Sequence, residues 1–221
     1  MNVQRSSPPT VVVVTGAAPL DRRAVAAIPP DAVVVAADGA LDHARAAGVD
    51  PHVLVGDLDS ISAAGLAWAT EHARLVRHPV DKNDTDTELA IAHAASYGPD
   101  RILVVAGAGD RLDHTVAALG ALGSPSLGTV ASLEAWWGDD RVHVVHAPRC
   151  VALDMPAGTT FSVLAMHGPA RGVSVRGARW PLTDHDLEPL VGLGVSNVAE
   201  TAVTVSVTDG IVTVVVPGAA S

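Results

Sequence analysis

An alternation of short apolar runs with alanine-rich stretches, repeated up to about Leu122, constrains the fold of this chain most. The runs are rich in β-branched residues, and glycine and aspartate follow most of them. They lie at Val11–Val14, Val33–Ala36, Val53–Val55, Leu75–Arg77 and Ile102–Ala106. Short, nearly continuous apolar runs are typical of strands that are buried on both faces. The pattern therefore predicts a parallel sheet, with helices on both of its faces.

Alanine-rich stretches with a helical pattern follow these runs. They predict helices at Asp21–Ala27, Leu41–Ala47, Ala63–His72, Thr85–Ser96 and Asp113–Leu122. The fourth begins with a capping box, in which Thr85 is followed three residues later by Glu88.

The pattern changes after Gly128. Ala131–Trp137 and Arg141–His146 predict a hairpin, and no helical period follows Cys150. Further strands are expected at Thr160–Met166, Gly172–Val175, Thr201–Val207 and Ile211–Val216, with a tight hairpin turn at Asp209-Gly210 between the last two. We predict an α/β chain with two domains, a three-layer domain over residues 1–147 and a small antiparallel β-sandwich domain over residues 148–221.

Composition excludes several classes of protein. The formal net charge is −10, and no basic run is present, so a nucleic-acid partner is not expected. The longest aliphatic run, Val11–Val14, is too short to cross a bilayer, and the first ten residues lack the apolar core of a signal peptide. We therefore expect a cytoplasmic protein with no membrane partner. A single cysteine, Cys150, excludes a disulfide framework.

Aspartates gather directly after four of the predicted strands. Asp38 follows the second, Asp57 and Asp59 the third, and Asp110 and Asp113 the fifth. The fourth is followed by Asp81, Asp84 and Asp86. In open α/β sheets, ligands bind outside the carboxyl ends of the strands. The aspartates therefore predict a binding site at this edge, although aspartate also favours ordinary loops and helix caps.

So many carboxylates at one edge repel one another unless a cation neutralises them. An all-oxygen set of ligands suits Mg²⁺ or Mn²⁺, and Mg²⁺ is usually bound together with substrate phosphates. Arg111 and Lys82, the only lysine among 13 arginines, lie among the acids and are candidates to bind phosphate oxygens. Nearby glycines such as Gly39 allow backbone amides to approach phosphate. The residues predict metal-assisted transfer of a phosphoryl or pyrophosphoryl group.

Six segments resemble the thiamine pyrophosphokinase family. They are ADGALDHA, VGDLDSIS, HPVDKNDTDTELAI, GAGDRLDHTVAAL, GARWPL and GLGVSN, in family order between residues 36 and 197. The resemblance implies an N-terminal nucleotide-binding domain and a C-terminal β-sandwich domain that helps to bind thiamine. It implies transfer of pyrophosphate from ATP to the hydroxyl of thiamine, with Mg²⁺, giving thiamine diphosphate and AMP. It also implies a homodimer with a shared active site.

The resemblance assigns roles position by position. Asp57, Asp59 and Asp86 match the family's metal-ligand carboxylates and are, with Asp113, the expected catalytic residues. Residues expected to bind the nucleotide are Asp38, Gly39, Lys82, Thr85, Arg111 and His114. Trp180, Ser196 and Asn197 are expected to bind thiamine. Two positions depart from the family pattern, since Ala40 stands in place of a glycine and Asp110 adds a carboxylate beside Arg111.

Two other functions share many of these features. A pyrophosphokinase of another primary alcohol, such as a hydroxymethylpterin, would need the acidic edge but not Trp180, Ser196 and Asn197. A catalytically silent sensor of nucleotide or thiamine diphosphate would keep the fold but lose metal ligands. All the expected ligands are present in this chain, which argues against the sensor.

Overall fold

The computed structural model of the chain describes residues 10–109 and 111–218, which form two compact units. Unit 1 contains the residues up to 122 and residues 129–139. Unit 2 contains residues 123–128 and the residues from 140 onward. The predicted functional domains, 1–147 and 148–221, stay a prediction.

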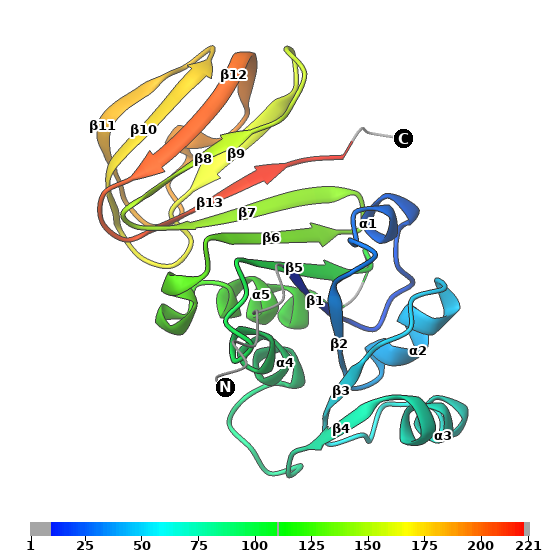
Figure 1. Cartoon of the computed structure of the whole chain (residues 1–221). Coiled ribbons are helices and arrows are strands. Elements are labelled where there is room, and N and C mark those ends of the chain that lie inside the picture. The colour runs from blue at the N-terminus through cyan, green and yellow to red at the C-terminus, as the bar shows by residue number, and fades with distance from the viewer. Residues whose placement is uncertain (1–9, 110, 219–221) are drawn as a thin grey trace, which may run out of the picture. The chain divides into compact units, whose positions relative to one another are not determined.

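Unit 1 is built on a parallel sheet (Figure 1). Its strand order is β6-β5-β1-β2-β3-β4, and every neighbouring pair is parallel. The strands are β1 (Thr10–Thr15), β2 (Val33–Ala37), β3 (Val53–Gly56), β4 (Arg74–Arg77), β5 (Arg101–Ala106) and β6 (Ser132–Trp137). All residues of β1 and β3 are buried, as the continuous apolar runs predicted. The predicted parallel sheet is confirmed.

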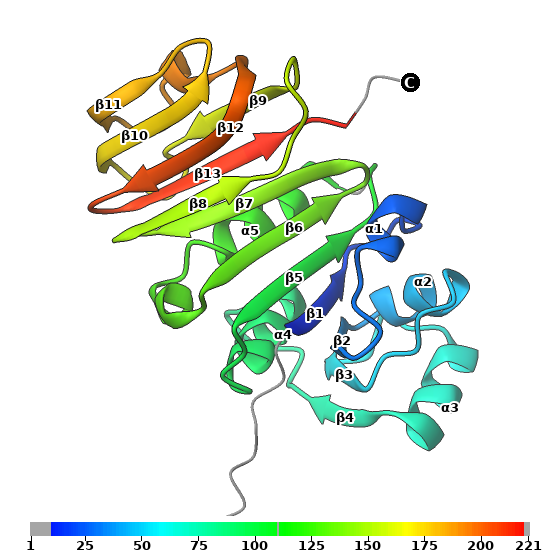
Figure 2. The same ribbon diagram turned by 45° about the horizontal axis from the view of Figure 1, so that its top comes forward.

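Helices follow the strands of unit 1 as the alanine-rich stretches predicted. They are α1 (Arg22–Ala26), α2 (Ala40–Ala46), α3 (Ala63–His72), α4 (Asp86–Ala95) and α5 (Leu112–Ala121). Small side chains of α1 and α2 pack against alternate residues of β1, among them Val12 and Val14. The helix α4 lies against β1, β2 and β3 and contacts α5 (Figure 2). Short alanine side chains allow this close packing of helix on sheet.

Unit 2 is antiparallel. Its strands are β7 (Asp140–His146), β8 (Arg149–Leu153), β9 (Thr160–Leu164), β10 (Ala170–Ala178), β11 (Leu182–Leu187), β12 (Asn197–Val207) and β13 (Ile211–Val216). Two short 3₁₀ helices, at Pro125–Thr129 and Gly192–Gly194, complete the described elements. One group of paired strands is β11-β10-β12-β8, and the other is β7-β13-β9. The first residues of β12 also pair with β9, so this long strand takes part in both groups.

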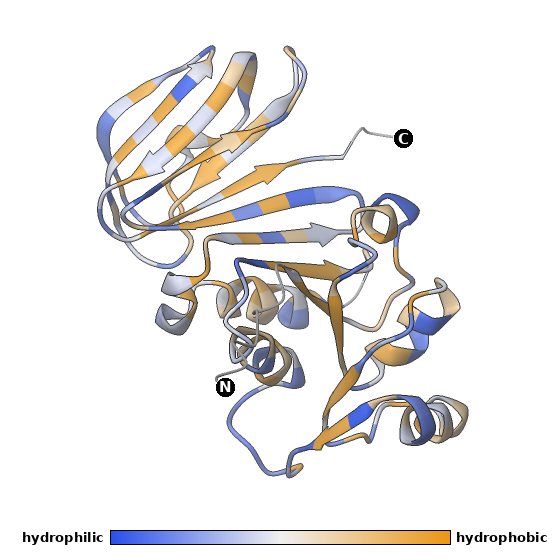
Figure 3. Cartoon of the chain, in the orientation of Figure 1, coloured by the Kyte–Doolittle hydropathy of each residue, from blue (hydrophilic) through white to orange (hydrophobic). Residues whose placement is uncertain are grey.

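Alternating hydropathy along the strands of unit 2 accounts for its sandwich. In Figure 3, apolar and polar residues alternate along β10 and β12, whereas β1 and β2 of unit 1 are apolar almost throughout. The inward-facing residues of unit 2, such as Val203, Val205 and the fully buried Phe161, form one hydrophobic core. Strands with one buried and one exposed face are typical of packed antiparallel sheets.

Three expectations for unit 2 were wrong or incomplete. Asp209-Gly210 does not join a hairpin, because β12 pairs with β8, β9 and β10 while β13 pairs with β7 and β9. The turn instead passes the chain from one group of strands to the other, and Asp209 forms a β-bridge with Arg171. The strands β8 and β11 were not predicted, because the sequence of β8, RCVAL, is short and that of β11, LTDHDL, is mostly polar.

Among the described residues, no helix is long and apolar enough to cross a membrane.

Candidate active site

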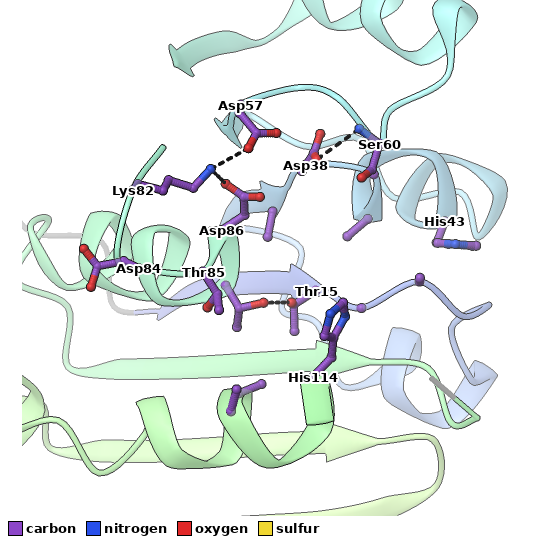
Figure 4. A pocket seen from close by; sticks show the side chains of 18 of the residues that line it. Thr15, Asp38, His43, Asp57, Ser60, Lys82, Asp84, Thr85, Asp86 and His114 are labelled. Atoms are coloured by element: carbon purple, nitrogen blue, oxygen red, sulfur yellow. Dashed lines mark hydrogen bonds and ion pairs between the residues drawn. The ribbon is translucent and has the colours of Figure 1, made fainter. Parts of the chain in front are cut away.

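Loops at the carboxyl ends of β1, β2 and β3 and the beginning of α4 surround a cavity of about 410 Å³ in unit 1 (Figure 4). The cavity therefore lies at the edge of the parallel sheet where ligands are expected. Polar residues dominate part of its wall. Those that line it are Thr15, Asp38, His43, Asp57, Ser60, Lys82, Asp84, Thr85, Asp86, Thr87 and His114.

Asp38 is the most buried acid of this cavity, with 5% of its surface exposed. It follows β2 in a left-handed conformation with φ of 43°, which aspartate tolerates better than most residues. Its Oδ2 accepts a hydrogen bond of 3.2 Å from the backbone N–H of Ser60. Its Oδ1 is buried and has no hydrogen-bond partner among the described residues. A buried carboxylate oxygen without a donor is costly, so this atom indicates a place for a cation or a polar ligand.

Burial raises the pKa of Asp38 to about 6. The hydrogen bond from Ser60 opposes this effect, and the negative charges of Asp86, Asp57 and Asp59 add to it. The carboxylate of Asp38 is therefore destabilised both by the loss of water and by its acidic neighbours.

Asp57 and Asp86 both form an ion pair with the same side chain, that of Lys82. The ammonium Nζ of Lys82 lies 2.7 Å from Asp57 Oδ2 and 2.9 Å from Asp86 Oδ1. The contact with Lys82 lowers the pKa of the Asp57 carboxyl. Burial disfavours the charged form of Lys82, but its hydrogen bond to Asp57 and its ion pair with Asp86 outweigh burial and raise its pKa. Lys82 is therefore held as an ammonium ion at the wall of the cavity.

Gly56 allows Asp38 and Asp86 to lie close together. This last residue of β3 has a φ of 149°, and a Cβ atom built on it would lie 3.0 Å from both Asp38 Cβ and Asp86 Oδ1. A side chain at position 56 would occupy the space between these two acids. The carboxylates therefore meet because the strand ends in glycine.

Asp38, Asp57 and Asp86 each offer an oxygen within 4.8 Å of the others. Three carboxylate oxygens at this spacing fit a hard divalent cation such as Mg²⁺. Asp59, which we predicted as a ligand, is exposed and does not belong to this group. Its Oδ1 accepts a hydrogen bond of 2.8 Å from Ser60 Oγ, and its N–H lies 3.3 Å from Asp57 Oδ1. Its role as a ligand stays a prediction.

The residues predicted to bind the nucleotide fall into two groups. Asp38, Gly39, Lys82, Thr85 and His114 line the cavity. Thr85 also caps α4, since its Oγ1 accepts a 3.2 Å hydrogen bond from Glu88 N–H. Arg111 does not line the cavity, and neither does Asp113, which we predicted as a catalytic residue; both are exposed and pair with each other at 2.6 Å. That pairing lowers the pKa of Asp113.

Of the two positions that depart from the family pattern, Ala40 and Asp110, the structure describes only Ala40. Ala40, the first residue of α2, is 2% exposed and packs in the hydrophobic core, while part of it reaches the cavity wall. Its methyl group therefore contributes to packing at the start of the helix. Asp110 lies outside the described residues.

The residues predicted to bind thiamine lie together in unit 2. Asn197 is buried, and its side chain holds the backbone of Trp180 from both sides: Asn197 Oδ1 accepts from Trp180 N–H at 3.1 Å, and Asn197 Nδ2 donates to Trp180 O at 2.7 Å. The Trp180 side chain remains accessible, with 57% of the residue exposed. Ser196 is exposed in a left-handed conformation with φ of 59°.

Several residues of the cavity were not predicted from the sequence. Thr15 ends β1 and forms a hydrogen bond with Thr87 of α4 through their side-chain hydroxyls. His43 of α2 also lines the wall. The signal for Thr15 was available, because it directly follows the predicted strand Val11–Val14, at the same edge as the aspartates. His43 carried no such signal, since it lies within a helix.

Two family models match the chain. The model of the thiamin pyrophosphokinase catalytic domain matches residues 27–128. The model of the thiamin pyrophosphokinase vitamin B1 binding domain matches residues 142–212. The first match contains every predicted metal ligand, and the second contains Trp180, Ser196 and Asn197. None of the curated protein sequences matches the chain.

Solved structures share the fold over most of the chain. The thiamine pyrophosphokinase of Bacillus subtilis has a TM-score of 0.81 at 19% identity, covering 96% of this chain and 100% of its own. A thiamin pyrophosphokinase family protein of Enterococcus faecalis has a TM-score of 0.76 at 22% identity, covering 96% and 99%. The thiamin pyrophosphokinase of Candida albicans has a TM-score of 0.73 at 15% identity, covering 94% and 89%. At these identities the likeness establishes the fold.

The raised pKa of Asp38 predicts a stability effect that depends on pH. Because the folded state keeps this proton up to about pH 6 and the unfolded state releases it near 3.8, unfolding free energy falls as pH rises through that window. Asp38→Asn removes this penalty and, since asparagine tolerates positive φ, keeps the backbone. We expect the variant to be more stable than the original chain by about 1–3 kcal/mol at pH 8 without metal.

Urea unfolding of both proteins in the presence of a chelator measures this difference. The gain should shrink toward zero below about pH 4, where the carboxyl is protonated in both states. An Asp38→Asn variant that is no more stable than the original chain at pH 8 would contradict the raised pKa of Asp38.

Proposed function

We propose, since the chain belongs to the thiamin pyrophosphokinase family, that the acidic cavity of unit 1 binds ATP with a divalent cation and is the site of pyrophosphate transfer to thiamine. The members of this family are enzymes, and the chain is a thiamine diphosphokinase with ATP as its co-substrate. The location of the site rests on the group of Asp38, Asp57 and Asp86, in which Asp38 Oδ1 has no hydrogen-bond partner among the described residues.

The residues present fit Mg²⁺. Its ligands in this proposal are Asp57, Asp59 and Asp86, which the sequence pattern indicates, together with Asp38, which lies within reach of two of them. All four offer hard oxygen ligands. When bound, the ion neutralises negative charge on the phosphate oxygens.

The side chains around the cavity have separate tasks in the reaction. Gly39 leaves room at the start of α2, where a Cβ atom would lie 2.9 Å from Ser60 O. In this proposal Gly39, Thr85 and His114 contact the nucleotide, while Lys82 and Arg111 donate hydrogen bonds to phosphate oxygens. Positioning and charge stabilisation account for most of the catalysis in such reactions.

The transfer is an in-line displacement at the β-phosphorus of ATP. The hydroxyl oxygen of thiamine forms a bond to that phosphorus while the bond to the oxygen bridging to the α-phosphorus breaks, and AMP leaves with the electron pair. The hydroxyl proton passes to a carboxylate. We propose the exposed Asp59 for this step and Asp113 as a further catalytic residue.

Unit 2 supplies the thiamine-binding residues in this proposal. The exposed indole of Trp180 offers a flat surface to an aromatic ring, and Asn197 fixes the backbone that carries it. Ser196, the neighbour of Asn197, adds an exposed hydroxyl. The thiazolium ring of thiamine is cationic, so the acidic character of the chain also suits this substrate.

We further propose a cytoplasmic homodimer in which the active site is shared between subunits. Exposed apolar residues in one short segment of unit 2 support self-association, since contiguous apolar surface marks interaction sites. They are Leu190, Val191, Leu193 and Val195, of which 67%, 50%, 54% and 47% is exposed.

Identification of the products tests whether pyrophosphate is transferred as one unit. With thiamine, ATP and Mg²⁺, we expect AMP and thiamine diphosphate in equal amounts, because pyrophosphate moves as one unit. Chromatography of nucleotides and thiamine esters measures both. ADP together with thiamine monophosphate would indicate transfer of a single phosphoryl group and would contradict the proposal. Activity with a hydroxymethylpterin but not with thiamine would support the alternative substrate class.

Removal of one carboxylate charge tests the metal site. Asp86→Asn should lower kcat by roughly 10²–10³-fold, because a charge that holds the cation in the transition state is lost. The fold should survive, since the N-cap of α4 is Thr85. Asp81→Asn is the matched control, because Asp81 is an exposed acid of the loop that precedes α4 and does not line the cavity. A large fall of the melting temperature in Asp86→Asn would instead indicate a structural role.

Truncation of Trp180 tests the thiamine site. Stacking on an indole contributes roughly 0.5–1.5 kcal/mol beyond area burial. Trp180→Ala should therefore raise the KM for thiamine by about threefold to tenfold or more and leave the KM for ATP nearly unchanged. Trp180→Phe, which keeps a flat ring, should restore most of the affinity. A folded Trp180→Ala protein with an unchanged KM for thiamine would show that this ring does not bind the vitamin.

A further inference from the structure

Lys82 joins two acids from different parts of unit 1. Asp57 follows β3, Asp86 begins α4, and Lys82 comes from the loop that precedes α4 (Figure 4). Its Nζ lies within 3 Å of both carboxylates, and only 13% of its side chain is exposed. The ammonium is therefore a partly buried cation at the acidic wall.

The same two carboxylates belong to the group that fits a divalent cation. Asp38, Asp57 and Asp86 each offer one carboxylate oxygen within 4.8 Å of the others, and Lys82 pairs with the last two. A metal ion bound by these acids would lie next to the ammonium. Two cations at this distance repel each other, so the ammonium and the metal compete for the same carboxylates.

One ammonium does not neutralise the group. Three carboxylates face a single positive charge, and Asp38 Oδ1 keeps no hydrogen-bond partner among the described residues. A divalent cation would bring twice the charge and would also contact Asp38. The exchange of ammonium for metal is therefore electrostatically favourable, while the lysine stabilises the acids until the metal arrives.

We infer that Lys82 is a resident counter-ion of the acidic cavity, which pairs with Asp57 and Asp86 in the metal-free protein and is displaced from them when a divalent cation binds. The inference rests on the proposed function, in which these carboxylates hold the cation. It adds that metal binding releases an ammonium group at the cavity wall, where it becomes available to phosphate oxygens.

Two simpler roles for Lys82 make different predictions. If the ion pairs persist beside the bound metal, the lysine does not oppose metal binding. If Lys82 serves only to bind phosphate, its removal weakens nucleotide binding and leaves the affinity for metal alone unchanged. Metal binding without nucleotide therefore distinguishes these roles from displacement.

The test measures Mn²⁺ binding to the full chain without nucleotide, by electron paramagnetic resonance of free Mn²⁺. Lys82→Met keeps a long apolar side chain and removes the competing charge. We expect it to bind Mn²⁺ about tenfold more tightly than the original chain, while Lys82→Arg, which keeps the charge, stays close to it. Arg74→Met is the matched control, since Arg74 is an exposed cation at the start of β4, at the opposite edge of the sheet.

Thermal unfolding gives a second readout that does not depend on activity. Lys82→Met should melt at a lower temperature than the original chain in the presence of a chelator, and Mn²⁺ should raise its melting temperature by the larger amount. Equal or weaker Mn²⁺ binding by Lys82→Met would overturn the inference and leave the metal site intact. Absence of Mn²⁺ binding in both proteins would overturn the proposed metal site and the inference with it.

Discussion

Parallel pairing of β1, β2, β3 and β4 determines where the candidate site of this protein lies. Each of these strands enters the sheet from the same side, so the residues that follow them emerge at one edge. Burial of the aliphatic strands on both faces stabilises this arrangement and leaves its loops free to carry polar residues. The acidic cavity is a consequence of that geometry, since Asp38, Asp57 and Asp86 follow the ends of three different strands, β2, β3 and β4.

The acids nevertheless oppose the fold that brings them together. Asp38 is buried, one of its oxygens has no hydrogen-bond partner in the described part of the chain, and its acidic neighbours raise its pKa further. Gly56 is needed so that Asp38 and Asp86 can approach. Lys82 offsets part of the repulsion by pairing with two of the three acids. Local destabilisation of this kind is common where a protein binds a cation or a substrate, because the missing charge arrives with the ligand.

Much of unit 1 could be predicted from the sequence, because its strands and helices have patterns that differ in period. The helix Ala63–His72 was predicted with the bounds that the structure shows, and the strands agree within a residue or two at each end. Unit 2 was harder. Its strand Leu182–Leu187 is polar along most of its length, and the turn at Asp209-Gly210 has the composition of a hairpin although its strands separate. Pairing between distant strands depends on core packing, which a local turn signal does not report.

The candidate site shows the same division between local and non-local information. The position of the aspartates after strands predicted the edge at which they lie, and the family segments indicated which ones to consider. The sequence did not reveal that Asp38 would join Asp57 and Asp86, because this depends on the left-handed backbone of Asp38 and on the glycine opposite. The ion pairs of Lys82 likewise span 25 residues along the chain to Asp57 and require the folded sheet.

The hydrogen bonds between Asn197 and Trp180 have a consequence for recognition of flat rings. Ordering the backbone of a loop residue costs about 1–2 kcal/mol of conformational entropy. At Trp180 this cost has already been met during folding, because Asn197 holds both its N–H and its C=O. Only the two side-chain torsions of the indole remain to be restricted when a ring stacks on it. If Trp180 binds thiamine as proposed, the buried amide of Asn197 prepares its exposed aromatic surface for binding with little further loss of entropy.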